Sequence, residues 1–323
     1  MLRMLVELAL AVLMPLSIAF AQGYPARPIT MVVPVSAGGP TDAIARTLAE
    51  RMGSTLGQPI VVENVTGAAG TIGVGRVERA EPDGYTIGIG LTSTHVFNGA
   101  IYKLPFDLVT DFAPISAVAT NPQFIVSRNG VPAKNLRELI GWLKANPGRA
   151  TMATIGPGSP AHIAGVLFQK ITETRFQFVP YRGGAPGMRD LLAGQIDLMI
   201  PQPSLALPQL KAGSIRVYAV TSSERLLSAP DIPTVDEAGA PGLHIAIWHG
   251  LWAPKGTPAA VIAKLNRAVR TALADLTVRR RFADMGQQIP PLEQQTPESL
   301  AALQRAEIAK WWPIIKAAGI ETQ

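Results

Sequence analysis

Apolar and polar positions follow two periods along most of this chain, one suited to buried strands and the other to amphipathic helices. Residues 29–35 form an apolar run that is typical of a buried strand. A glycine-glycine-proline break at 38–40 ends this run. Apolar residues then recur every four positions between 44 and 52, which predicts a helix with one buried face and Thr41 as its cap.

The same alternation continues toward the C-terminus and indicates an α/β protein with mostly parallel sheets. A capping pair of Asn135 with Glu138 predicts the start of a helix, and Pro160 suits the first position of another. Threonine-proline pairs at 257–258 and 296–297 predict two further helix starts, and the last helix is expected to end near 311–312. Further strands are predicted at 60–63, 85–89, 150–154, 177–180, 196–200 and 215–220.

Two extended stretches, at 114–128 and 244–253, interrupt the alternation. We interpret them as two crossings between lobes, because no linker of biased composition separates one half of the chain from the other. The expected boundaries give lobe 1 residues 22–122 and 248–323, and they give lobe 2 residues 123–247. Two α/β lobes joined by two hinge crossings form a clamp that can close around a ligand in the central cleft.

The first residues resemble a secretory signal peptide. Residues 5–20 are almost wholly apolar and follow Arg3, and residues 19–21 have the A-x-A pattern of a cleavage site. Because the run is short for a membrane span, we expect residues 1–21 to be removed and the mature protein to be periplasmic. The alternative is an uncleaved anchor, which the single basic residue and the interrupting Glu7 leave open.

Composition excludes several chemistries. The chain has no cysteine, so disulfides, thiolate metal sites and cysteine nucleophiles are ruled out. The formal net charge is +6, but the basic residues are scattered and only 279–281 form a run. Without interleaved aromatic residues this run predicts a solvated helix face and no nucleic-acid partner. We expect no metal and no cofactor.

Glycine-containing loops precede predicted helices at 37–40, 67–70 and 156–159. A strand that leads through such a loop into a helix directs free main-chain N–H groups at one point, which favours an anion. None of the loops has the G-x-G-x-x-G or P-loop pattern, so nucleotide hydrolysis is not indicated. Each loop alone can be an ordinary tight turn, but two of them lie in different predicted lobes.

Other polar residues leave alternatives open. The hydroxyl residues at 92–94 follow a strand and either face a ligand or form a turn. His162 can face the cleft or be structural, Trp248 can line the cleft or pack the hinge, and for Asp42 we favour a structural role at a helix N-terminus. No catalytic motif such as G-x-S-x-G or H-E-x-x-H is present.

A series of ordered motifs resembles one family, the Bug (TctC-like) periplasmic solute receptors of tripartite tricarboxylate transporters. The likeness covers essentially the whole chain after residue 21. The motifs are YPARPI at 24–29, VPVSAGGPTD at 33–42, LGQP at 56–59, VVEN at 61–64, PDGYT at 82–86, LPFD at 104–107, DF at 111–112, VPYRG at 179–183, LLAGQID at 191–197, IPT at 232–234, EAG at 237–239 and AP at 253–254.

The resemblance implies a type II periplasmic binding-protein fold and a receptor that is not an enzyme. It implies that main-chain amides of the first glycine loop hold a carboxylate, partly through ordered water, and that hydroxyl loops of both lobes complete the site. The residues implied are Val35, Ser36, Ala37, Gly38 and Gly39 with Thr41 as the cap, then Ser93, Thr94 and Asn98, and in the second lobe Thr154, Gly156, Gly158, Ser159, His162 and Tyr181.

The chain departs from the family pattern at two places. Pro40 replaces a third glycine, which stiffens the first loop and removes one N–H donor. Pro201 and Gln202 stand where many members carry Asp-Asn, and we include Gln202 in the expected ligand-binding set. Since that aspartate could pair with a ligand ammonium group, its absence favours a mono- or dicarboxylate without an amine.

The sequence therefore predicts an extracytoplasmic receptor that binds a small organic acid and presents it to the permease subunits of a tripartite transporter. A monomer is expected. The alternatives are an orphan periplasmic sensor for a carboxylate and, less favoured, an enzyme that acts on an organic acid in the same cleft.

Overall fold

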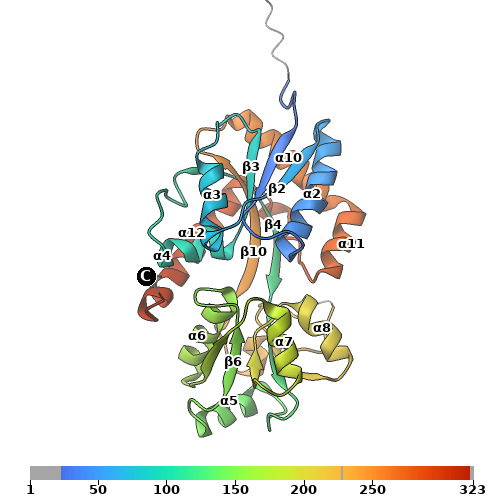
Figure 1. Cartoon of the computed structure of the whole chain (residues 1–323). Helices are drawn as coiled ribbons and strands as arrows, with labels where there is room; N and C mark the ends of the chain where they lie inside the picture. Colours follow the sequence, from blue (N-terminus) through green and yellow to red (C-terminus); the bar gives the residue numbers. More distant parts are fainter. Residues whose placement is uncertain (1–22, 227, 321–323) are drawn as a thin grey trace, which may run out of the picture.

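Two five-stranded sheets, each covered by helices, form two lobes of the computed structural model (Figure 1). The structure describes residues 23–226 and 228–320. The predicted signal peptide at 1–21 lies outside the described residues. None of the described helices is both long enough and apolar enough to cross a bilayer.

The first lobe is built on the sheet β2-β1-β3-β10-β4, drawn at the top of Figure 1. Its strands are β1 (Ile29–Val33), β2 (Ile60–Asn64), β3 (Thr86–Leu91), β4 (Phe112–Pro122) and β10 (Ala246–Pro254). Its helices are α2 (Pro40–Leu56), α3 (Thr71–Glu78), α4 (Asn98–Ile101), α10 (Ala259–Ala274), α11 (Leu276–Asp284) and α12 (Pro297–Ala317), with short turns η1 (Ala68–Gly70), η2 (Ser93–Phe97) and η3 (Leu292–Gln294).

The second lobe is built on the sheet β7-β6-β8-β5-β9. Its strands are β5 (Phe124–Arg128), β6 (Thr151–Thr154), β7 (Gln177–Pro180), β8 (Leu198–Met199) and β9 (Ile215–Val220). Its helices are α5 (Leu136–Ala145), α6 (Pro160–Thr172), α7 (Gly184–Leu192), α8 (Pro203–Lys211) and α9 (Val235–Ala238).

Strand β1 shows why both faces of the first sheet are covered. Ile29, Met31 and Val33 point to one face and belong to the apolar cluster that includes the buried side of α2. Val32 points to the other face and packs with the apolar side chains of α3. A strand buried on both faces reads as a continuous apolar run, which is the pattern of residues 29–35.

The expectation of mostly parallel sheets is wrong, because both sheets are mixed. In the first sheet β1 runs parallel to β2 and β3, whereas β10 runs antiparallel to β3 and β4. In the second sheet β6 runs parallel to β7 and β8, whereas β5 runs antiparallel to β8 and β9. The antiparallel pairs all involve the strands that carry the chain between the lobes.

Hydrogen bonds join the two crossings between the lobes. The chain leaves the first sheet at the end of β4, passes through Gln123 into β5, and returns into β10 (Figure 1). Thr221 accepts from the Gln123 N–H at 2.8 Å and donates its hydroxyl to the Ile245 carbonyl at 2.7 Å. One threonine thus links both crossings beside the cleft. The lobe boundaries at 122/123 and 247/248 stay a prediction.

Several local predictions are confirmed and others are corrected. Asn135 accepts from the Glu138 N–H at the start of α5, and Pro160 begins α6. The arginines at 279–281 are exposed on α11. Helix α12 continues beyond 311–312 to residue 317 despite an internal proline, so its predicted end is wrong.

Candidate functional site

A cavity of about 350 Å³ lies between the two lobes. Three segments of the first lobe and one loop of the second lobe form its wall, and no charged side chain lines it. The lining residues are Pro34, Val35, Ser36, Thr66, Gly67, Ala69, Gly70, Ser93, Asn98, Ile101, Tyr102, Ile155, Pro157, Gly158, Ser159 and Pro160. We call this space the interlobe cavity.

The loop between β1 and α2 offers free main-chain donors, and it reaches the interlobe cavity with Val35 and Ser36, whereas residues 37–39 do not line the cavity. Among the described residues, no group accepts from the N–H of Ser36, Ala37 or Gly39. The Gly38 N–H is different, because it donates to the Asp42 carboxylate at 2.9 Å. Gly38 has φ of 82°, a left-handed conformation that glycine adopts without strain. The first loop therefore keeps three of its N–H groups available for an anion.

The predicted helix cap at Thr41 is wrong. Helix α2 begins at Pro40 with Gly39 as its N-cap, and no side chain caps it. The buried Thr41 hydroxyl instead lies 3.0 Å from Nε2 of His249 on β10. This contact connects the start of α2 to the strand that returns from the second lobe.

Asp42 holds the first loop in place. Its Oδ2 accepts from Gly38 and from Nε of Arg46, and its Oδ1 accepts from the Asn64 side chain at 2.9 Å. The hydrogen bond from Arg46 is the main reason that the Asp42 pKa is lowered to about 2, with the Gly38 and Asn64 hydrogen bonds acting in the same direction. The carboxylate is ionised and fully engaged by the protein.

Replacing Asp42 with asparagine is expected to weaken acid binding about tenfold, because the loop loses the charge that orders it. Isothermal titration with an acid that binds the unmodified protein measures this change. Glu50→Gln on the same helix is the control, since Glu50 forms only an exposed ion pair with Arg281. Equal affinities of the Asp42→Asn variant and the unmodified protein would show that loop order does not limit binding.

The segment after β3 divides into cavity-facing and inward-facing residues. Ser93 and Asn98 line the interlobe cavity, and Asn98 also donates to the Ala69 carbonyl at 3.0 Å. Thr94 is buried, and its hydroxyl contacts Leu91 and Nδ1 of His95. Of the predicted pair, Ser93 is thus placed on the cavity and Thr94 supports the turn from beneath.

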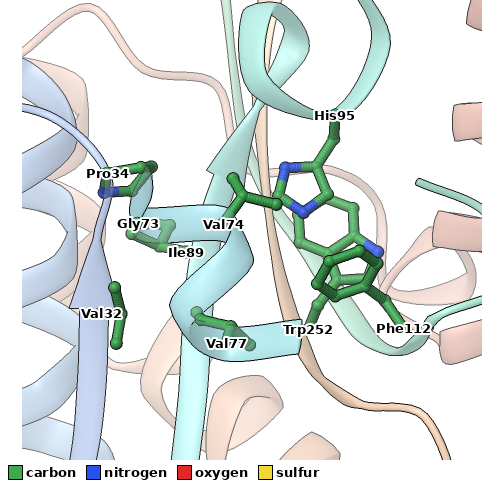
Figure 2. Close-up of a pocket in the computed structure, with 10 residues that line it drawn as sticks. Val32, Pro34, Gly73, Val74, Val77, Ile89, His95, Phe112 and Trp252 are labelled. Atoms are coloured by element: carbon green, nitrogen blue, oxygen red, sulfur yellow. The ribbon is translucent and has the colours of Figure 1, made fainter. Parts of the chain in front are cut away.

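His95 fills the space behind this segment. Its ring stacks on Trp252 with centroids 3.9 Å apart, and Phe112 lies against its edge (Figure 2). Val74 and Val77 of α3 close a small apolar void of about 10 Å³ beside them. Burial lowers the His95 pKa to about 3, so the ring is neutral at physiological pH.

Hydrogen bonds within the loop between β6 and α6 fix the wall of the second lobe. Ser159 is the N-cap of α6 and accepts from the His162 N–H, while its hydroxyl donates to the Gly156 carbonyl at 2.7 Å. The Gly158 N–H donates to Nδ1 of His162 at 3.1 Å. Burial lowers the His162 pKa, which keeps this nitrogen available as an acceptor. His162 therefore orients Gly158 and Ser159, which line the cavity.

The lining of the interlobe cavity does not include four other predicted residues, namely Thr154, Gly156, Tyr181 and Gln202. The Tyr181 hydroxyl donates to Asp190 at 2.7 Å, and burial raises its pKa to about 12. Thr154 is buried at the end of β6, one residue before Ile155. Gln202 lines a second cavity, described below, and does not line the first.

Thr92 and Trp248 take part in packing between strands and do not line the interlobe cavity. The Thr92 hydroxyl donates to the Ala246 carbonyl and accepts from the Trp248 N–H, so it fastens the end of β3 to β10. Trp248 is 3% exposed, lies beside Trp252 and is absent from the lining of the interlobe cavity.

The predicted residues omitted the loop at 66–70, which lines the interlobe cavity. Its conformation is unusual, because Gly67, Ala68, Ala69 and Gly70 all have positive φ. The glycines at 67 and 70 were the available signal, and they marked this loop as one of three that precede a helix. Alanine gives no indication that it adopts a left-handed conformation, so the shape of this wall was not predictable.

The fold and the site together define a periplasmic binding protein, with two α/β lobes, two crossings and a polar, uncharged cavity between them. Residues 44–320 match the family model described as the tripartite tricarboxylate transporter family receptor. The chain therefore belongs to this family, the TctC or Bug receptors, which are transporter receptors and not enzymes.

Solved structures of relatives agree with this assignment. The periplasmic binding protein BugD is 40% identical with a TM-score of 0.78, and the match covers 93% of this chain and 100% of BugD. MatC from Rhodopseudomonas palustris, solved with malate, is 38% identical with a TM-score of 0.78 and coverages of 90% and 100%. Rpa4515 of R. palustris, solved with adipate, is 33% identical with a TM-score of 0.80 and coverages of 93% and 100%.

Proposed function

We propose that this protein is an extracytoplasmic receptor that binds a small carboxylate in the interlobe cavity for uptake by a tripartite transporter. The observation that carries the proposal is the set of unpartnered N–H groups of Ser36, Ala37 and Gly39, in a loop whose Ser36 lines a cavity without charged side chains. Such a wall stabilises an anion through main-chain dipoles, and no histidine, carboxylate or basic side chain lines it that could activate its hydroxyl groups.

The free energy that helix N-termini contribute is too small to account for binding by itself. A helix N-terminus contributes about 0.3–1 kcal/mol toward a nearby anion, and up to about 2 kcal/mol when partly buried. A micromolar ligand requires about 8 kcal/mol. Helix α6 begins on the cavity wall at Pro160 and α2 begins at the end of the first loop, yet together they supply only a part of this free energy. Direct and water-mediated hydrogen bonds in the closed cleft must supply the rest.

The proposed ligand is a mono- or dicarboxylate without an amine. The family relatives MatC and Rpa4515 carry malate and adipate, which supports an organic acid. Neither Asp nor Glu lines the interlobe cavity, so no side chain there can neutralise a ligand ammonium group. The proposed contacts are the free N–H groups of Ala37 and Gly39 and the predicted residues that line the wall, namely Val35, Ser36, Ser93, Asn98, Gly158 and Ser159.

Thermal unfolding with a panel of organic acids tests the proposal. A ligand at a thousand times its Kd stabilises the folded protein by about 4 kcal/mol, so the matching acid is expected to raise the Tm by several degrees. Mass spectrometry of the recovered acid is expected to find it unchanged. Absence of any saturable shift across the panel, or conversion of the acid, would contradict the proposal.

Uptake measurements separate transport from sensing. Deletion of the gene is expected to abolish accumulation of the matching labelled acid, and expression of the protein from a plasmid is expected to restore it. Unchanged uptake with loss of an acid-dependent transcriptional response would instead indicate a sensor.

Export and monomeric state are also part of the proposal. Intact mass of the protein from a periplasmic extract is expected to correspond to a chain that begins at residue 22. Light scattering of the same material is expected to give the mass of one chain.

A further inference from the structure

A second cavity, of about 290 Å³, adjoins the interlobe cavity. Ile155 and Pro160 line both spaces, so the two cavities share one wall. We call the second space the side cavity. It lies between α6, α7 and α8 of the second lobe and the crossing strands, and Pro40 closes it from the first lobe.

The side cavity is apolar and contains no charged residue. Met199, Leu205 and Ile247 supply apolar surface, and the polar lining consists of Gln123, Gln202 and Ser204. Most of the side chains on this wall are apolar, so an apolar group placed here gains free energy from leaving water. The chemistry of the wall therefore favours an apolar occupant.

Two features indicate that a ligand completes this space. Ile155, on the shared wall, is 49% exposed although it is a large aliphatic residue. Gln123 is 3% exposed, and its Oε1 has no hydrogen-bond partner among the described residues. An apolar ligand body would cover Ile155, and a water molecule held beside it would donate to the Gln123 oxygen.

We propose that the side cavity receives the apolar body of a monocarboxylate whose acid group occupies the interlobe cavity. This inference rests on the proposed function, and it narrows the ligand from organic acids in general to acids with one charged end. A cavity of roughly 150 Å³ holds a benzene molecule, so a space of about 290 Å³ accommodates an aromatic ring or a short alkyl chain.

Titration calorimetry with butyrate, hexanoate and octanoate tests the apolar contact. The affinity is expected to rise about fourfold with each methylene that enters the side cavity. Adipate has the same number of carbons as hexanoate but a second charge, and it is expected to bind at least roughly tenfold more weakly. Adipate binding as tightly as hexanoate, or more tightly, would overturn the inference while leaving the proposed receptor function intact.

Replacing Leu205 with lysine provides a second test. Leu205→Lys places an ammonium group in the side cavity, so hexanoate is expected to bind roughly tenfold more weakly and adipate more tightly than to the unmodified protein. Leu207→Lys is the matched control, because Leu207 is also half-buried on α8 but does not line the cavity. An unchanged ratio of the two affinities in a folded Leu205→Lys protein would contradict the placement of the ligand body.

The ligand series on the unmodified protein does not depend on the stability of either variant. Failure of these four acids to bind while another acid of the panel binds would overturn the inference alone, whereas failure of every acid in the panel would contradict the proposed function itself.

Discussion

Replacing Gly39 with aspartate is expected to abolish binding of organic acids while the protein still folds. The new carboxylate would lie among the free N–H groups of Ser36 and Ala37, where it would occupy the anion site and repel the ligand. Juxtaposed like charges cost several kcal/mol, so the affinity is expected to fall at least roughly hundredfold. Titration calorimetry with the best acid from the panel measures the loss.

The backbone at Gly39 makes this substitution informative. Gly39 is the N-cap of α2 with φ of −84° and ψ of 171°, a conformation that any residue adopts. An added Cβ would meet only the Ser36 carbonyl oxygen, at 3.6 Å. Aspartate is a favoured N-cap residue, so the Tm is expected to stay equal or to rise.

Gly39→Asn separates charge from shape. Asparagine has the size of aspartate and also caps helices well, but it is neutral. We expect this variant to retain much more affinity than Gly39→Asp. Equal losses in both variants would indicate a steric effect and would contradict an anion site built from main-chain dipoles.

Local sequence patterns predicted those elements whose stabilising contacts are themselves local. Ser159 caps α6 and Thr296 caps α12, each through a hydrogen bond to a residue three positions later. The strand at 29–35 and the helix that follows were predicted within a few residues. Short-range capping and periodicity are properties of a segment and can be interpreted without the rest of the chain.

The failed predictions involve partners that are distant in the sequence. Thr41 was expected to cap its own helix, but its hydroxyl contacts His249, 208 positions away. The strand directions were also mispredicted, because β10 inserts between β3 and β4 after an excursion through the whole second lobe. Nothing within one segment encodes such a neighbour.

The two cavities show the same difference between features encoded within one segment and features that combine distant segments. The glycine loops gave the position of the interlobe cavity, since a strand, a loop and a helix start are consecutive in the sequence. The side cavity combines Gln123, Ile155, Gln202 and Ile247 from four separate segments. Only Gln202 was anticipated, and that expectation came from a family resemblance and not from the residue pattern.

The free energy of unfolding is expected to fall by about 4 kcal/mol between pH 7 and pH 5 because of two buried histidines. Burial lowers the pKa of His95 to about 3 and that of His249 to about 4, whereas an unfolded histidine has a pKa near 6.5. The unfolded chain therefore binds more protons below pH 6.5, and stability is lost as the pH falls from there toward 4. Each histidine contributes about half of the loss.

Calorimetric unfolding at pH 5 in two buffers of different ionisation enthalpy counts the protons directly. The two histidines are expected to take up about two protons on unfolding, and His162, whose pKa is also lowered by burial, adds to this uptake. His249→Asn is expected to lower the uptake by about one proton, whereas His244→Asn is the control, because His244 lies on the surface beside Asp236.

The lowered pKa of Asp42 affects stability only below about pH 4, so it does not contribute between pH 7 and pH 5. The rings of His95 and His249 both stay neutral in the folded protein at pH 5, so their contacts with Thr41 and Thr94 are expected to persist, and the affinity for an acid is expected to be the same at pH 7 and pH 5. Unfolding without proton uptake at pH 5 would show that these histidines are already charged in the folded protein, and it would contradict the expected loss of stability.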